Sequence, residues 1–373
     1  MNFTISKKII DEAIEFLYSF IDQSDSYLPQ RGIYLELDNE KLTLISTSSS
    51  ISGKRIIEVD EKDLKIKRTG KTLLNSIILK NIIKKFDKEV TFSVEDNVVN
   101  IFENKTKYTI TQLDYNKYPK INFEDTENSF EISSELLNKV INDVYISTAH
   151  STNNERLNVA VFRCINISSK SDGYLRFLST DSYRLSTEKI KINKINDINI
   201  NIDAKNLKKL ITKGVPEKIN VFYNIDKFGI SYEGSIIQTS ISKINFIDLN
   251  NLLEIKYNKT IEIDKDELLK LINKVVFHNT EKAKKLQFSI SKNSINITFE
   301  IPEIGISEVS TNKHNLVGKD FEIDVDYQFL KDAVSVLSSG IIKLYITEND
   351  DKIYLISENE KDNIQLITPI RKF

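Results

Sequence analysis

The apolar positions along the chain predict the same order of elements three times. In each copy, a short alternating strand leads into a helix whose apolar residues recur every three or four positions. The strands begin at Phe3, Phe130 and Ile261, about 130 residues apart. The predicted N-caps of the helices are Ser6, Ser133 and Asp264. A recurrence at this distance indicates three copies of one domain, because the period is too long for a solenoid repeat.

A second helix and a pair of alternating strands recur deeper in each copy. The predicted caps of these helices are Asn75, Asp203, and either Asp324 or Asp326. In the first copy, the predicted apolar face of this second helix consists of Ile78, Leu79, Ile82, Ile83 and Phe86. In the second copy, the predicted apolar face of the helix that follows the first strand consists of Leu136, Leu137, Val140, Ile141 and Val144. Each copy therefore combines two helices with many short antiparallel strands, which is an α+β fold.

The domain boundaries follow from the three copies. We expect the three repeats to occupy residues 1–128, 129–257 and 258–373. The chain contains only 10 glycines and 5 prolines, and it has no obvious flexible linker. We therefore expect the domains to pack rigidly, through strands that pair across the boundaries.

The charged residues are informative only locally. Lys and Arg number 52 against 54 Asp and Glu, so the net charge of −2 indicates neither a nucleic-acid-binding protein nor an acidic tail. The second helices of the first two copies nevertheless lack acidic residues and are rich in lysine. Their lysines include Lys80, Lys84, Lys205, Lys208, Lys209 and Lys213, of which Lys80, Lys84, Lys205 and Lys209 are predicted to lie opposite the apolar faces. They form either a solvated helix face or a surface that contacts phosphates without reading bases. The third copy is less basic, because Asp324, Asp326 and Asp332 accompany Lys331.

Residues typical of enzymes and metal sites are sparse. The three histidines lack metal-ligand spacing, and Cys164 has no second cysteine with which to form a disulfide or a zinc site. Gly70-Lys71-Thr72 matches the end of a phosphate-binding loop, but Lys65 stands where that motif requires glycine. We expect no catalytic residues, no cofactor and no metal. The alternative is a nucleotide-dependent enzyme that uses Gly70-Lys71-Thr72.

The chain has neither a recognisable secretion signal nor a predicted membrane span. Charged residues such as Lys7, Lys8 and Asp11 interrupt the amino-terminal stretch, where a signal peptide is apolar. No apolar run reaches the roughly 18 residues that a transmembrane helix needs. We therefore expect a cytoplasmic protein with no membrane partner.

One short string, Thr180-Asp181-Ser182-Tyr183-Arg184-Leu185, follows an apolar run that reads as a strand, so we expect a turn there. The string is either an ordinary turn or, with Thr180, Tyr183 and Arg184 exposed, a recognition site. It resembles the central T-D-x-[HY]-R-L motif of bacterial DNA polymerase III sliding clamps. The resemblance extends over the whole chain: residues 1–5 are similar to the family's opening strand, residues 113–119 to its L-P-x-x-x-[FY]-P string, and residues 368–371 to its terminal M-P-[MIV]-R.

This resemblance implies a ring-shaped processivity factor. Clamps of this family are head-to-tail homodimers with helices lining a hole around duplex DNA, and they tether the replicative DNA polymerase and other proteins that carry a clamp-binding motif. In this family a separate clamp loader, and not the ring itself, hydrolyses ATP. The positions that would face DNA are the six lysines named above, together with His150 and Arg156 from the central loop. The positions that match the dimer contact are Tyr108 and Ile110 on one side and Phe277 and His278 on the other.

The resemblance also implies a pocket between the second and third domains for partner peptides of the Q-L-x-L-F type. Carried over by position, it consists of Leu157, Thr180, Ser182, Tyr183, Arg184, Leu185, Phe246, Ile247, Leu252, Pro369, Ile370 and Arg371. Three departures from the family's pattern lead us to expect an altered partner motif. Ile247 replaces a common proline, Thr368 replaces a methionine, and Lys372-Phe373 extends beyond an arginine that is nearly terminal in relatives.

Overall fold

The computed structural model describes residues 1–60, 62–123, 128–149, 159–170, 172–192, 196–278 and 284–371. The chain forms two compact units: Met1–Glu135 with Lys205–Ile241, and Leu136–Ala204 with Ser242–Phe373. Each unit is described by itself. The division runs through the second repeat, and the domain boundaries predicted above stay predictions.

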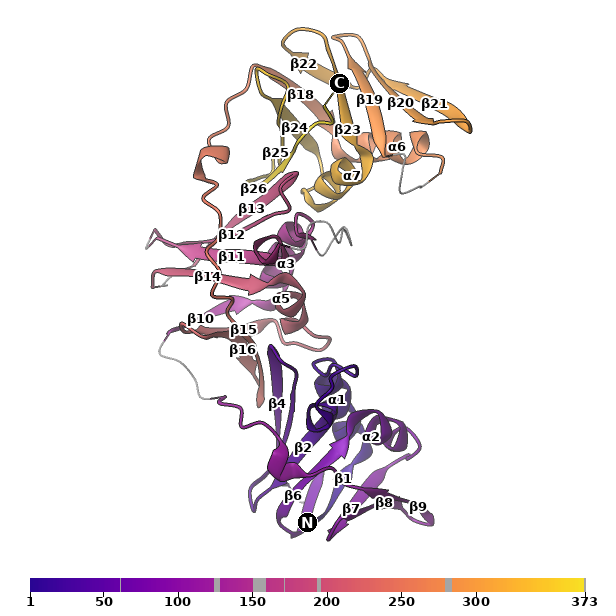
Figure 1. The fold of residues 1–373 in the computed structure, drawn as a ribbon, viewed down its shortest axis with the longest axis vertical. Helices are drawn as coiled ribbons and strands as arrows, with labels where there is room; N and C mark the ends of the chain where they lie inside the picture. Colours follow the sequence, from indigo (N-terminus) through magenta and orange to yellow (C-terminus); the bar gives the residue numbers. More distant parts are fainter. Residues whose placement is uncertain are drawn as a thin grey trace. The chain divides into compact units, whose positions relative to one another are not determined.

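The first unit contains two antiparallel sheets (Figure 1). The five-stranded sheet has the order β5 (Leu64–Arg68), β1 (Asn2–Ser6), β7 (Glu89–Glu95), β8 (Val98–Glu103) and β9 (Thr106–Thr111). The eight-stranded sheet has the order β10 (Asn128–Ser133), β15 (Lys218–Tyr223), β16 (Lys227–Tyr232), β17 (Ser235–Ser240), β4 (Ile51–Glu58), β3 (Lys41–Thr47), β2 (Gly32–Leu37) and β6 (Gly70–Asn75). Its centre is the β17–β4 pair, in which Ser235 faces Arg55 and Thr239 faces Ile51. This pairing joins the first and second repeats and confirms that strands pair across repeats.

The second unit repeats this arrangement. Its nine-stranded sheet has the order β14 (Ile198–Asp203), β11 (Cys164–Ser169), β12 (Tyr174–Thr180), β13 (Arg184–Lys191), β26 (Glu360–Ile367), β25 (Ile353–Ser357), β24 (Ile341–Ile346), β18 (Lys259–Asp264) and β22 (His314–Val317). Its four-stranded sheet has the order β21 (Gly305–Thr311), β20 (Ile295–Ile301), β19 (Lys285–Ile290) and β23 (Phe321–Asp326). The β13–β26 pair, with Arg184 opposite Ile367, joins the second and third repeats.

Six α-helices lie in the described residues and pack on these sheets. They are α1 (Lys7–Tyr18), α2 (Ser76–Ile83), α3 (Ser134–Tyr145), α5 (Ala204–Leu210), α6 (Lys265–Val275) and α7 (Tyr327–Val336). The pairs α1 and α2, and α6 and α7, lie side by side in Figure 1 and contact each other. Their buried faces close apolar cores, such as the one in which Phe3 of β1 stacks on Phe92 of β7 with ring centroids 4.8 Å apart. The α+β prediction is confirmed.

The helix caps predicted at Asn75 and Asp264 are confirmed, whereas those at Ser133 and Asp203 stay predictions. Asn75 accepts a hydrogen bond from the Ile78 amide at 3.1 Å. Asp326, rather than Asp324, caps α7 by accepting from the amides of Gln328 and Phe329. Ser6 stands at the N-cap position of α1, but its side chain makes no capping hydrogen bond, so that prediction was wrong in its chemistry.

Two residues predicted in apolar helix faces are exposed. Ile78 is 46% exposed and Leu136 is 36% exposed. In α2 the buried residues Leu79, Ile82 and Ile83 already form a complete i, i+3, i+4 stripe. Because Ile78 lies one position before that stripe, its side chain is rotated about 100° away from it.

Candidate functional site

The predicted turn forms between β12, which ends at Thr180, and β13, which begins at Arg184. The Asp181 amide donates to the Arg184 carbonyl at 3.3 Å, which closes the turn. Asp181 Oδ1 accepts hydrogen bonds from the amides of Tyr183 and Arg184 at 3.0 and 3.1 Å. Ser182 has a φ of 77°, in the left-handed region that tight turns require. The turn prediction is confirmed.

Exposure of Thr180 and Arg184 was predicted wrongly. Thr180 is 6% exposed and Arg184 only 2% exposed. The Thr180 hydroxyl donates to the Arg184 carbonyl at 2.7 Å, which holds it in the turn. Only Ser182 and Tyr183 project from the turn, and Tyr183 is 50% exposed.

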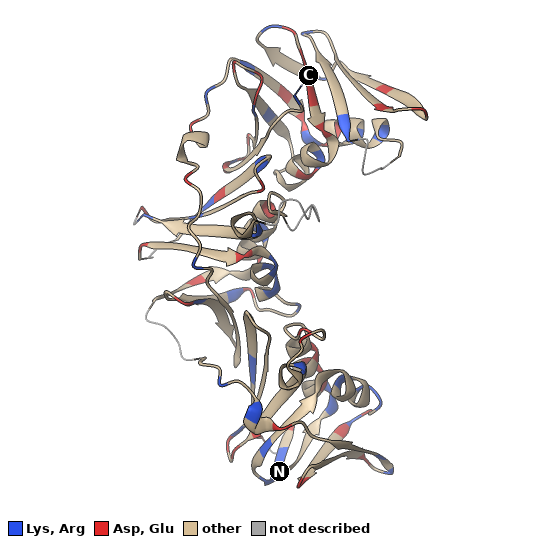
Figure 2. Cartoon of the chain, viewed as in Figure 1, with Lys and Arg blue, Asp and Glu red and all other residues tan. Residues whose placement is uncertain are grey.

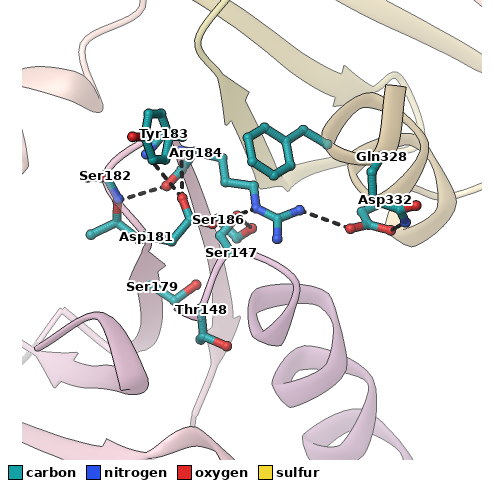
Figure 3. Close-up of polar contacts among 12 residues, drawn as sticks. Ser147, Thr148, Ser179, Asp181, Ser182, Tyr183, Arg184, Ser186, Gln328 and Asp332 are labelled. Atoms are coloured by element: carbon teal, nitrogen blue, oxygen red, sulfur yellow. Dashed lines mark hydrogen bonds and ion pairs between the residues drawn. The ribbon is translucent and has the colours of Figure 1, made fainter. Parts of the chain in front are cut away.

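Arg184 is buried because its charge is fully paired. Its Nε donates to Asp181 Oδ2 at 2.9 Å, and its guanidinium donates to Asp332 Oδ2 on α7, also at 2.9 Å (Figure 3). The guanidinium carbon lies 4.3 Å from the centre of the Phe329 ring. Burial raises the pKa of Asp181, although the charge of Arg184 acts in the opposite direction. Arg184 thus fastens the turn of the second repeat to a helix of the third.

An apolar cluster lies beside this turn and uses residues from three parts of the chain. Leu178, Leu185, Tyr354 and Leu366 form its buried floor, against which the connecting segment before β18 packs Phe246, Leu249, Leu252, Leu253 and Ile255. The amide and the hydroxyl of Thr368 both donate to the Tyr183 carbonyl, each at 2.9 Å. The Ile370 amide donates to the Asp324 carbonyl on β23 at 2.7 Å. The carboxyl-terminal segment is therefore held against the turn and the third repeat.

The structure brings together much of the predicted pocket. Thr180, Arg184, Leu185, Phe246 and Leu252 belong to the turn and the apolar cluster, and Pro369 and Ile370 follow the anchored Thr368. Ile247 is 42% exposed, Ile370 is 37% exposed, and Arg371 is also exposed. Leu157 and the Lys372-Phe373 extension lie outside the described residues. Throughout, we call the group Ser182, Tyr183, Leu252 and Ile370 the turn surface, and Leu185 lies buried beneath it.

The two lysine-rich helices differ in a way that the sequence pattern did not reveal. Glu15 on α1 pairs with Nζ of Lys80 on α2 at 2.7 Å and with Nζ of Lys84, the C-cap of α2, at 2.8 Å. Lys80 also lies 4.1 Å from the ring centre of Tyr18, and its side chain is only 21% exposed. Burial alone would raise the pKa of Glu15, but hydrogen bonds from both lysines hold it below its usual value. The outward position predicted for Lys80 is wrong, because Glu15 and Tyr18 of α1 cover its side chain.

On α5, the lysines are exposed as predicted. Lys205, Lys208 and Lys209 on α5, and Lys213 just after it, all lie at the surface, whereas Leu207 and Leu210 are buried. Figure 2 shows this concentration of basic residues on α5. His150 and Arg156 lie outside the described residues.

The nucleotide-loop alternative is wrong. Gly70-Lys71-Thr72 forms the start of β6 and is paired with β2, so its backbone amides belong to a sheet and not to a phosphate-binding loop. Lys71 pairs with Glu36 at 2.9 Å, and the buried Thr72 hydroxyl donates to Gln112 at 2.8 Å. Within the described residues, no cluster of three or more His, Cys, Asp or Glu side chains could hold a metal ion. No helix in the same part of the chain is long and apolar enough to cross a membrane.

The residues predicted for the dimer contact lie in different units. Tyr108 and Ile110 are half-buried on β9, an edge strand of the five-stranded sheet. Phe277 is 46% exposed, and with His278 it lines a cavity of about 330 Å³ beside α6 and α7. The sequence did not single out β21, the edge strand of the four-stranded sheet, where Ile306 and the neighbouring Ile304 are 62% and 66% exposed.

Comparisons with known proteins agree with these observations. Residues 1–122 match the family described as DNA polymerase III beta subunit, N-terminal domain, and residues 251–371 match its C-terminal domain. The beta sliding clamp of Mycoplasmopsis pulmonis is 28% identical over 366 residues, covering 96% of each chain. The beta sliding clamp of Lactococcus lactis is 24% identical over 392 residues, covering 100% of this chain and 99% of that one.

Solved structures show the same fold. The DNA polymerase sliding clamp from Bacillus subtilis aligns with a TM-score of 0.93 at 20% identity, and the beta subunit from DNA polymerase of Streptococcus pyogenes with a TM-score of 0.91, also at 20% identity. Both alignments cover 100% of each chain. The chain belongs to the bacterial DNA polymerase III beta sliding clamps, the non-catalytic processivity factors of DNA replication.

Proposed function

We propose that two copies of this chain close head to tail into a ring around duplex DNA and tether partners through the turn surface. The observation that carries the ring is a pair of edge strands, β9 in the first repeat and β21 in the third. An edge strand presents unpaired backbone groups, so it can add a strand from a second chain. Because the two edges belong to opposite ends of the repeat series, a β9–β21 contact is heterologous and can close a ring.

The two edges are complementary in charge and in apolar character. β9 carries Lys107 and follows Lys105, whereas β21 carries Glu308 and follows Glu303, and all four side chains are exposed. Their apolar side chains include Tyr108 and Ile110 on β9 and the exposed Ile304 and Ile306 at β21. Opposite charges around an apolar centre favour this pairing over β9–β9 or β21–β21 contacts.

The lysines of α5 supply the surface that we assign to DNA. Lysines on a helix can exchange phosphate partners without reading bases, which holds a duplex while it slides. Lys209 and Lys213 are exposed on or just after α5. Lys84 contributes less in this assignment, because Glu15 already shares its charge.

For partners, we propose that an extended apolar peptide of the Q-L-x-L-F type binds at the turn surface. Exposed Tyr183 and Ile370 border the apolar cluster that contains Leu185 and Leu252, which is the combination that such a peptide needs. We expect the replicative polymerase and the clamp loader to contain such peptides. A tethered polymerase remains at high effective concentration near its template, which is the physical basis of processivity.

The deciding experiment loads the protein onto nicked circular DNA with a matching clamp loader and ATP, and then raises the salt concentration. We expect the protein to stay on the circle in high salt and to be lost when the DNA is linearised. An electrostatic contact cannot behave in this way, because salt weakens it on circles and linear DNA alike. Release from intact circles in high salt, with a control clamp retained, would refute the ring.

A further inference from the structure

A partly buried group of charges lies where the second and third repeats join, and its lysine side chain is 38% exposed. Lys139 Nζ on α3 contacts Asp143 Oδ2 at 2.7 Å, Glu188 Oε1 at 2.9 Å and Glu360 Oε1 at 2.6 Å. Glu188 lies on β13 and Glu360 on β26, so one ammonium group joins a helix and a strand of the second repeat to a strand of the third. We call these four residues the Lys139 cluster.

The cluster holds more negative charge than its lysine can balance. The side chains of Asp143 and Glu188 are only 9% and 3% exposed, and that of Glu360 is 22% exposed. Three carboxylates and one ammonium carry a net charge of −2 when all are ionised, which is costly away from water. Asn363 donates to Asp143 at 3.1 Å and Ser338 donates to Glu360 at 2.5 Å, but both donors are neutral.

Glu188 is the group best placed to carry a proton. Its Oε2 is buried and accepts no hydrogen bond from a nitrogen or hydroxyl donor. A protonated Oε2 would instead be a donor, and the carboxylate of Asp143, which contacts the same ammonium group as Glu188, would be available to accept. Burial raises the pKa of Glu188 to about 8; Lys139 opposes this, and the charge of Asp143 adds to it.

We propose that the Lys139 cluster retains one proton on Glu188 at neutral pH, and that this proton fastens the β13–β26 strand pair. Glu188 lies directly opposite Asn363 in that pair. The ionisable groups facing Glu188 are Lys139 and Asp143 from α3 and Glu360 from β26. The proton leaves the cluster with a net charge of −1 and turns Glu188 Oε2 from an acceptor without a donor into a donor.

Loss of the proton would weaken the β13–β26 strand pair, which carries the turn surface at one end. The same strand pair places Leu185 opposite Leu366 and Arg184 opposite Ile367, at the end where partners are proposed to bind. The folded protein binds one proton more than the unfolded chain between the ordinary glutamate pKa of 4.5 and about 8. The contribution of the proton is therefore complete below pH 4.5 and is lost as the pH rises through about 8.

The first test is carbon-13 NMR of the full chain with labelled glutamate carboxyl groups, titrated from about pH 5 to 10. We expect one glutamate carboxyl carbon to titrate with a midpoint between about 7 and 9. We expect Glu188→Gln to remove that signal, since the amide keeps a donor and an acceptor but cannot titrate. Glu131→Gln, which changes an exposed glutamate paired with Lys218, should leave it in place. Titration of every glutamate below about pH 6 would overturn the proposal, even if the Glu188→Gln protein failed to fold.

The second test rests on the proposed peptide function. A fluorescent Q-L-x-L-F peptide should bind the wild-type protein about three- to tenfold more weakly at pH 9 than at pH 7, with less than about a twofold change for Glu188→Gln. An equal change in both proteins would overturn the link to the turn surface. Absence of binding at every pH would refute the proposed peptide function and leave the NMR result to decide on the proton.

Discussion

Arg184 supports the proposed recognition surface without being exposed on it. It stands in the string that most resembles a recognition motif, yet it is buried against Asp181, Asp332 and the Phe329 ring. Its neighbour Tyr183 is the residue that reaches solvent. The guanidinium positions the turn, and the turn presents Tyr183 and the carbonyl that holds Thr368.

Replacing Arg184 should therefore cost stability and peptide affinity together. We expect Arg184→Ala to lower the free energy of unfolding by about 3–5 kcal/mol, because it leaves the buried carboxylate of Asp181 without its positively charged partner. Urea unfolding of the protein, followed by tyrosine fluorescence, would measure this loss of stability. The deficit should shrink as the pH falls toward 3.8, the ordinary pKa of aspartate, because protonation neutralises Asp181 in the variant.

The matched control is Arg371→Ala, which removes an exposed arginine of the same predicted pocket. It should leave unfolding unchanged. If Arg184→Ala unfolded at the wild-type urea concentration and still bound peptide normally, the positioning role of Arg184 would be wrong.

The helices α2 and α5 show that the same lysine pattern can have different electrostatic consequences. Both helices are acid-free, and both were predicted to present lysines to solvent. Packing of α1 against α2 brings Glu15 within 2.8 Å of Lys80 and Lys84, whereas the lysines of α5 stay exposed. The element on which a helix packs thus decides how much of its charge remains for a phosphate backbone.

This difference predicts unequal contributions to DNA binding. Removing two phosphate contacts with Lys209→Ala and Lys213→Ala should reduce the slope of log affinity against log salt by about 2 on a short linear duplex. The pair Lys80→Ala and Lys84→Ala should reduce it by less than about 1, since Glu15 partly neutralises both lysines. Fluorescence anisotropy at several salt concentrations would measure the slopes. Lys218→Ala, on the sheet and paired with Glu131, is the control, and a reduction there as large as on α5 would contradict the assignment.

The whole molecule is organised by strand pairs that cross the repeats. The β17–β4 and β13–β26 pairs build large sheets within the two units, while β9 and β21 stay at sheet edges among the described strands. In the proposed ring, each of these continuous sheets would resist bending between the two repeats that it joins. The remaining edges are the places where a second copy can continue the same pattern.

Ile110→Ala should weaken the dimer, because it removes apolar area that the β9–β21 contact would bury. We expect a loss of about 1–3 kcal/mol in the free energy of association, measured by sedimentation equilibrium. Ile225→Ala is the matched control, since Ile225 is 83% exposed in the turn between β15 and β16 and belongs to neither edge strand. A dimer as tight as the wild type in Ile110→Ala would show that β9 lies outside the interface.

Much of this protein can be inferred from local patterns. The helix faces, the caps at Asn75 and Asp264 and the turn at Asp181 all depend on residues within a few positions of one another, and the repeat is the recurrence of such local patterns. Periodicity and capping chemistry are properties of such short segments, so one sequence was enough to predict them. The exceptions, Ile78 and Leu136, lie at the edge of an apolar stripe, where periodicity alone does not decide burial.

The charged sites could not be inferred in the same way, because their partners are distant in the chain. Lys80 meets Glu15 through packing of α2 on α1, Arg184 meets Asp332 on α7, and Lys139 meets Glu360 across the β13–β26 pair. A side chain's exposure and the pKa of its neighbours depend on which elements come together in three dimensions. The amino-acid sequence therefore determined the repeated architecture and the family resemblance, whereas long-range packing decided which lysines stay exposed, that Arg184 is an anchor, and where a buried proton can reside.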